Sequence, residues 1–169
     1  AVLRLYFLQL MGSSEALLDL RYPRFRDTGR GLLWEPRPLY VCWDAAFLGS
    51  VRRLYSAFYE GRDEAFRAAL HELELAPAEA TLRESFGGSQ QHAVRFSVAE
   101  FRQAFHDVFL QCQRSGSVLH GNFLSLGVYL ACLYQHLETL GGAHDARAAF
   151  LAVRAALGHR SESLSGSSP

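Results

Sequence analysis

The chain has 169 residues, of which 49% are hydrophobic and 20% are charged, and its formal net charge at pH 7 is zero. This length suits one domain with a sizeable core. The balanced charge gives no electrostatic indication of a nucleic-acid partner or of an anionic membrane surface. The three cysteines, Cys42, Cys112 and Cys132, are odd in number, widely spaced and set among apolar residues. That pattern favours buried thiols in a reducing, intracellular compartment over a disulfide framework.

The N-terminal half of the chain shows apolar residues at helical spacing and little alternation of the kind that predicts strands. Residues 1–11 are apolar nearly all round, and 16–20 read as a short helical turn. Residues 21–38 hold three prolines and two glycines, which predicts a long irregular connection. A helix is predicted over 39–59, and Gly61 suits its C-terminal cap.

The C-terminal half carries the clearest helix signals. A helix over 62–75 stops before Pro77, and residues 86–92, FGGSQQH, are predicted to be a loop. Ser97 and Glu100 form a capping box at the start of a helix that runs to about residue 113. The remaining predicted elements are two helices, 119–140 and 145–157, and a polar disordered tail, 159–169. The predicted fold is therefore an all-α, single-domain bundle of six to eight helices over 1–158.

Residues 115–137 contain no formally charged side chain, which raises three interpretations. The length approaches the roughly 20 residues that a membrane span needs. However, His120, Asn122, Gln135 and His136 limit the apolar part to 123–134, which is more typical of a buried core helix. We therefore predict a central helix covered by amphipathic neighbours. The third interpretation is a groove, in which Phe105, Val108 and Phe109 face Leu124, Val128 and the 66–73 helix and accept the apolar face of a partner helix.

Motifs for catalysis or metal binding are not evident in the sequence. It has no phosphate-binding glycine-rich loop, no H-E-x-x-H and no paired C-x-x-C. Cys132 and His136 share a helix face at i, i+4, but no third zinc ligand lies nearby, which favours a buried Cys and a polar His. The sequence therefore predicts a non-enzymatic protein without a cofactor or metal and without a nucleic-acid partner.

Two segments resemble the Bcl-2 family. Residues 104–133, AFHDVFLQCQRSGSVLHGNFLSLGVYLACL, are similar to the region where an amphipathic helix ending in Phe leads through a short turn to a central helix. In that turn the cellular Asn-Trp-Gly-Arg motif corresponds to Leu119-His120-Gly121-Asn122, so only the glycine is retained. Residues 52–77 resemble the second helix of gammaherpesvirus Bcl-2 homologues, in which a Leu-Tyr pair precedes an acidic stretch, Phe and Leu.

This resemblance implies an anti-apoptotic protein, most similar to viral Bcl-2 homologues, that holds the amphipathic homology helix of pro-apoptotic proteins in a surface groove. It implies action in the host cytoplasm or at the mitochondrial outer membrane, reached through a segment outside this sequence. The position of the family's ligand-pairing Arg carries Asn122, which offers a hydrogen bond but no charge. The implied groove residues are Phe66, Leu70, Ala104, Asp107, Val108, Gly121, Asn122, Leu124 and Ser125.

Three other functions stay open at the level of sequence. The first is a structural helical subunit, whose apolar stripes dock into a larger assembly and leave an apolar patch exposed outside the groove. The second is the C-terminal helical part of a larger atypical kinase of the UbiB type, where a comparable Asn-Phe, here Asn122-Phe123, precedes an apolar helix. That interpretation places the catalytic residues upstream. A membrane-inserting hairpin over 97–140 is the weakest alternative.

Overall fold

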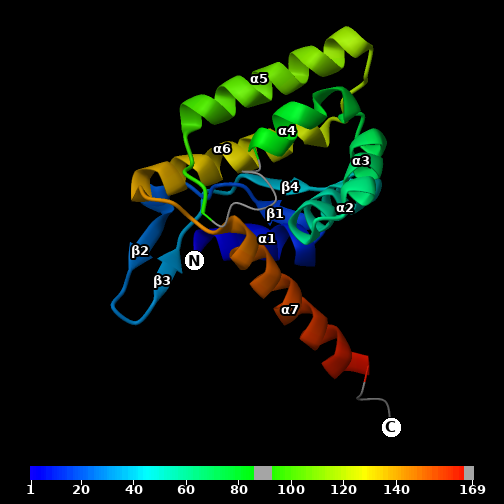
Figure 1. The fold of residues 1–169 in the computed structure, drawn as a ribbon. Helices are drawn as coiled ribbons and strands as arrows, with labels where there is room; N and C mark the ends of the chain where they lie inside the picture. The colour runs from blue at the N-terminus through cyan, green and yellow to red at the C-terminus, as the bar shows by residue number, and fades with distance from the viewer. Residues whose placement is uncertain (86–92, 166–169) are drawn as a thin grey trace.

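The computed structural model describes residues 1–85 and 93–165, which form helices and a few short strands (Figure 1). The α-helices of the described residues are α1 (Val2–Gly12), α2 (Ala45–Glu60), α3 (Asp63–Glu72), α4 (Glu79–Ser85), α5 (Val98–Ser115), α6 (Asn122–Leu140) and α7 (Ala146–Ser165). The strands are β1 (Glu15–Leu17), β2 (Phe25–Asp27), β3 (Leu32–Trp34) and β4 (Tyr40–Cys42). Single-turn 3₁₀ helices are η1 (Tyr22–Arg24) and η2 (Ala76–Ala78). The prediction of a mainly helical protein is confirmed, although the fold is not purely α.

The segment between α1 and α2 forms two small antiparallel sheets, where we predicted helix and irregular chain. Strand β1 pairs with β4, and β2 pairs with β3 in a hairpin that projects away from the helices (Figure 1). Each strand has only three residues, which is too short for an alternating pattern to be recognised. Helix α2 consequently begins at Ala45 instead of residue 39.

Two predicted helix caps are present. The Oγ of Ser97 accepts a hydrogen bond from the backbone N–H of Glu100 at the start of α5, as the capping box predicts. At the end of α2, Gly61 adopts a left-handed conformation with φ of 71° and donates its N–H to the last carbonyls of the helix. The Asp44 carboxylate caps the other end of α2 by accepting the N–H of Phe47 at 2.9 Å.

We predicted that a central helix at 119–140 would be covered by its neighbours. In the structure, α6 is covered on only part of its surface. One face is buried through Phe123, Tyr129 and Leu133, whereas Leu124 and Val128 on the other face are 60% and 45% exposed. The groove interpretation placed Leu124 and Val128 opposite α5, and this prediction is also wrong. The physical reason is that α6 packs on α1 and α5 from one side only.

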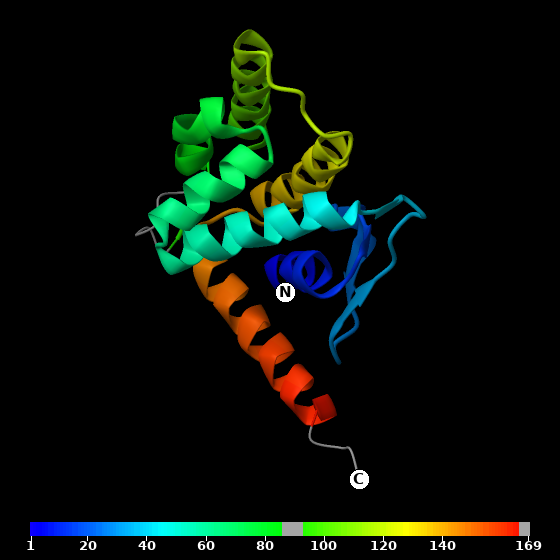
Figure 2. The same cartoon turned by 90° about the vertical axis from the view of Figure 1, so that its right-hand side faces the viewer.

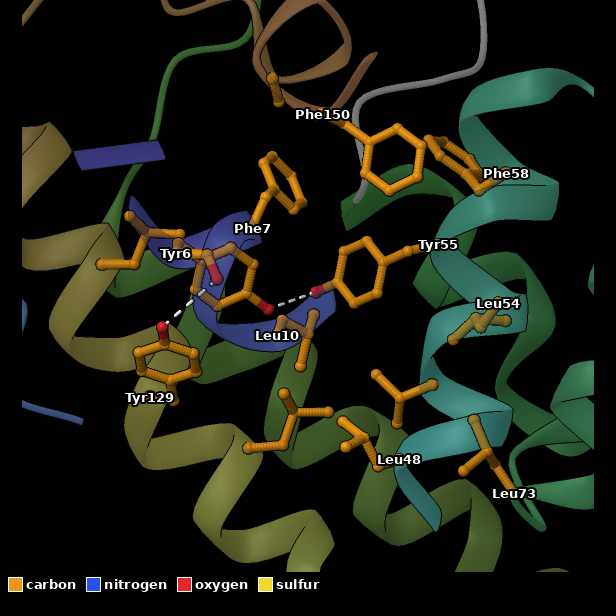
Figure 3. Packing of buried hydrophobic residues seen from close by; sticks show 14 of the residues in the cluster. Tyr6, Phe7, Leu10, Leu48, Leu54, Tyr55, Phe58, Leu73, Tyr129 and Phe150 are labelled. Carbon is orange, nitrogen blue, oxygen red and sulfur yellow. Dashed lines mark hydrogen bonds between the residues drawn. The ribbon is translucent and has the colours of Figure 1, made fainter. Parts of the chain in front are cut away.

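The core instead surrounds the inner side of α1, which lies between α2, α7 and the strands (Figure 2). Tyr6 and Phe7 are almost completely buried there. The Tyr6 ring contacts Tyr55 of α2 and Tyr129 of α6, and the Phe7 ring contacts Phe150 of α7 (Figure 3). Three helices that are distant in sequence are therefore held by two adjacent aromatic residues.

Helix α7 runs to Ser165, eight residues beyond the predicted end at Leu157. Residues 159–165, which we predicted to be part of a disordered tail, therefore continue this helix. Residues 166–169 and the predicted loop 86–92 lie outside the described residues. Among the helices that are described, not one combines the length and the hydropathy that crossing a bilayer requires.

Two glycines near the start of α6 allow a matched test of its packing against α5. A Cβ at Gly127 would lie 2.6 Å from the ring of Phe105, which is itself stacked on Phe123, whereas a Cβ at Gly121 would meet nothing within 4 Å. We predict that Gly127→Ala lowers the free energy of unfolding relative to Gly121→Ala by about 1–3 kcal/mol. Urea denaturation of both variants measures this difference. Equal stabilities would show that Phe105 moves aside freely.

Candidate functional site

A largely apolar cavity lies between α5 and the layer formed by α1, α2 and α6. Its volume is about 100 Å³, and it is partly open to solvent. Helix α1 contributes Leu3, Tyr6 and Phe7, and α2 contributes residues such as Val51 and Tyr55. Together with side chains of α4, α5 and α6, they enclose a space that is lined by uncharged side chains as far as the described residues show. A cavity of this chemistry suits an apolar ligand.

The structure brings only two of the predicted groove residues to this cavity, Ala104 and Val108 of α5. Phe66 and Leu70 of α3 are completely buried in the core and do not line it. The guanidinium group of Arg83 lies over the Phe66 ring at 4.4 Å. Asp107 accepts a hydrogen bond from Gln103 on the same helix at 3.0 Å.

The other predicted groove residues lie at the start of α6 and point elsewhere. Gly121 and Leu124 are exposed, and Ser125 is half-buried without lining the cavity. The Oδ1 of Asn122 accepts the backbone N–H of Asp44 at 2.8 Å, so this side chain joins the start of α6 to the start of α2. The nine residues thus do not form one groove in this conformation, and the Bcl-2-type function stays a prediction that these contacts do not test.

A second site, which is polar and which the sequence did not reveal, surrounds Asp19 in the loop between β1 and β2. Asp19 is completely buried. Arg21 donates two hydrogen bonds to its carboxylate, from Nε to Oδ1 at 2.6 Å and from Nη2 to Oδ2 at 2.8 Å. The Nε of Arg24 lies 3.2 Å from Oδ2. The hydrogen bonds from Arg21 are the main reason why the pKa of Asp19 lies below its usual value, and backbone N–H groups of Arg37 and Arg21 add to this effect.

The backbone of this loop is fixed from two sides. The Nδ1 of His136 on α6 donates to the carbonyl oxygen of Leu20 at 2.8 Å, since a carbonyl can only accept. The Nε1 of Trp34 on β3 donates to the carbonyl of Asp19 at 3.1 Å. His136 is buried against the rings of Tyr22 and Phe25. Burial lowers its pKa, so its neutral form is favoured.

One sequence signal indicates this site in retrospect. In Leu17-Leu18-Asp19-Leu20 a single carboxylate interrupts an apolar run, and two arginines follow at positions 21 and 24. A lone charge in an apolar run is buried only where it is paired. In the sequence analysis these arginines were assigned to an irregular connection.

The prediction of three buried thiols holds for Cys112 but is wrong for Cys42, which lies exposed on the short edge strand β4. Cys132 is half-buried, and His136 is engaged with Leu20. Across residues 1–85 and 93–165 no group of three or more His, Cys, Asp and Glu side chains is arranged to hold a metal ion. Comparisons with protein-family models, with curated proteins and with solved structures found no match for this chain.

We predict that Asp19→Asn lowers the free energy of unfolding at pH 7 by about 1.5–3 kcal/mol, because it weakens hydrogen bonds to a buried charged group. The pKa of Asp19 is lowered in the folded state, so its contribution is complete above the unfolded value, roughly 3.9, and is lost as pH falls through the folded pKa. Denaturant unfolding between pH 3 and 7 measures both effects. Glu64→Gln, which changes an exposed carboxylate, is the control. Equal losses in the two variants would contradict a structural role for Asp19.

A second pH dependence is expected from His136. Its folded pKa is lowered, so the unfolded chain binds more protons as pH falls below about 6.5, and the protein loses stability in that range. In His136→Asn the amide nitrogen keeps a donor for the Leu20 carbonyl but does not titrate. We predict a smaller loss of stability between pH 7 and pH 5 in this variant than in the parent chain. Thermal unfolding at both pH values measures it, and parallel losses would show that His136 does not contribute.

Proposed function

We propose that this chain is the C-terminal part of a kinase-like protein and that it does not transfer phosphate. The observation that carries the proposal is the buried Asp19 loop. Protein kinases place their catalytic Asp and a metal-binding Asn on a loop of the form H-R-D-L-x-x-x-N. In this chain Asp19-Leu20 begins a loop of the same length, and Arg24 occupies the position of the Asn. This proposal alters the atypical-kinase alternative, which rested on Asn122-Phe123 alone and placed the catalytic residues upstream of this chain.

Catalytic residues need a rigid backbone. The backbone of the Asp19 loop is held in place in a way that would meet this need. It follows strand β1 and ends in the η1 turn directly before the β2–β3 hairpin. The backbone N–H of Glu35, the residue after β3, donates to the carbonyl of Arg24 at 2.9 Å. An acidic residue therefore lies beside the end of the loop, and kinases hold magnesium there with the Asp of D-F-G.

The chemistry of this site differs from that of an active kinase. Leu17 and Leu18 stand in place of His and Arg, and Glu35 is followed by Pro36 and Arg37 instead of Phe and Gly. The catalytic Asp of a kinase must accept the proton of the substrate hydroxyl, but both Asp19 oxygens already accept hydrogen bonds from Arg21. Arg24 adds a positive charge where a magnesium ligand is needed. These changes support a structural or partner-binding role.

Exposed apolar residues near the sheets suggest that another part of the same protein covers them. Leu32, Leu33, Leu39 and Tyr40 are between 44% and 66% exposed, and all lie on or beside β3 and β4. Exposed apolar side chains within one short segment of chain are typical of an interaction surface. We assign this surface, residues 32–40, to contact with an upstream part of the same protein, which also agrees with the sequence-based alternative of a helical subunit in a larger assembly.

The test begins with the gene. We expect coding sequence upstream of residue 1, and a gene that starts at residue 1 would refute the proposal. In the whole protein we expect amide hydrogen exchange at residues 32–40 to be at least about tenfold slower than in this chain, a difference of ~1.4 kcal/mol. The exposed face of α6 at Leu124 and Val128 serves as the internal control and should exchange equally in both. Equal exchange at residues 32–40 in both forms would show that no upstream part of the protein covers this surface.

Phosphoryl transfer is tested separately on the whole protein. With magnesium and labelled ATP, we expect no transfer above that of the Asp19→Asn variant. Transfer that disappears in this variant would leave the kinase-like assignment in place but refute the inactive state.

A further inference from the structure

We propose that the cavity between α5 and the α1, α2 and α6 layer binds a neutral hydrocarbon group, either a small apolar molecule or the end of an alkyl chain. This inference is independent of the proposed kinase-like origin, since it rests on other residues. Its first support is size, because the cavity has a volume of about 100 Å³. Engineered apolar cavities of roughly 150 Å³ in other proteins bind benzene or xenon.

The second support is the chemistry of the walls. Among the described residues, the lining contains no Asp, Glu, Lys, Arg or His side chain. Four of its hydroxyl groups, those of Tyr6, Tyr55, Ser85 and Tyr134, form hydrogen bonds within the protein. Tyr6 and Tyr55 bond each other at 2.7 Å, Tyr134 donates to the carbonyl of Ser85 at 3.3 Å, and the Ser85 hydroxyl donates to the carbonyl of Thr81 at 2.8 Å.

A polar ligand would therefore lose hydrogen bonds to water and would find these four hydroxyl groups already engaged, and each polar group left without a partner costs several kcal/mol by the usual scales. A stable water molecule in the cavity would likewise need two to four polar partners, by the same general accounting. A hydrocarbon group has no such requirement, and it gains the transfer energy of apolar burial. The lining of the cavity therefore favours an uncharged, apolar ligand.

The third support is the weak closure of the wall that α5 provides. Of the residues of α5, only Val108 and Cys112 are fully buried. Phe101, Ala104 and Phe105 also line the cavity but stay partly exposed. A small outward movement of α5 would admit a ligand without breaking the aromatic contacts of Tyr6 and Phe7 on the opposite wall.

The chain offers a matched pair of variants on α5. Ala104 lines the cavity, whereas Ala99 lies on the exposed side of the same helix. We expect toluene to shift the NMR signals of methyl groups lining the cavity in the parent chain and in Ala99→Leu. In Ala104→Leu the added side chain fills the space, and we expect binding at least about tenfold weaker, a loss of ~1.4 kcal/mol. Ala104→Val is the second variant, with an intermediate loss, if the leucine disturbs folding.

A parallel titration with octanoate separates the two sources of the hydrocarbon. Binding of octanoate at least as tight as that of toluene assigns the site to an alkyl chain whose carboxylate stays outside, and binding of toluene alone assigns it to a free apolar molecule. The absence of toluene-induced shifts, or unchanged affinity in Ala104→Leu, would overturn the proposal. Displacement of toluene by labelled pro-apoptotic homology-helix peptides, with tighter binding than either hydrocarbon, would overturn it in favour of a protein partner.

Discussion

The hydrogen bond between the hydroxyl groups of Tyr6 and Tyr55, which is buried and 2.7 Å long, holds α1 against α2. The Tyr129 hydroxyl adds a link from α6 by donating to the carbonyl of Tyr6 at 3.3 Å (Figure 3). Burial raises the pKa of Tyr6 and Tyr55, so both keep the protons that these bonds need. The cavity lies on the side of this pair that faces α5, since Tyr6 and Tyr55 form part of its lining.

The Asp19 cluster shows how a charged group can fix a loop while losing its own reactivity. A buried carboxylate is tolerated only when it is paired and hydrogen-bonded. In this chain Arg21 donates hydrogen bonds to both carboxylate oxygens and Arg24 adds a nearby positive charge, and His136 and Trp34 hold the adjoining backbone. The same hydrogen bonds that fix the carboxylate occupy both of its oxygens. We therefore interpret the Asp19 cluster as a structural site.

The helices were predictable because their signals are local. Ser97 and Glu100, the glycine after α2 and the apolar stripes act within a few residues of chain. The strands were not, since a three-residue strand is defined by its partner: β1 pairs with β4 across more than twenty residues. The position of the cavity was not predictable either. Of the nine residues predicted to form a groove, Ala104 and Val108 line this cavity, whereas Leu124 of α6 is exposed.

By itself the sequence determined that the protein is mainly helical and where most helices begin and end. Only the tertiary structure decided which carboxylate is buried, which face of α6 is free and where the cavity lies. The physical reason is that helix formation depends on hydrogen bonds and caps between near neighbours. Burial of Asp19 and the gap beside α5 depend instead on side chains contributed by segments distant in sequence, from Tyr6 to His136.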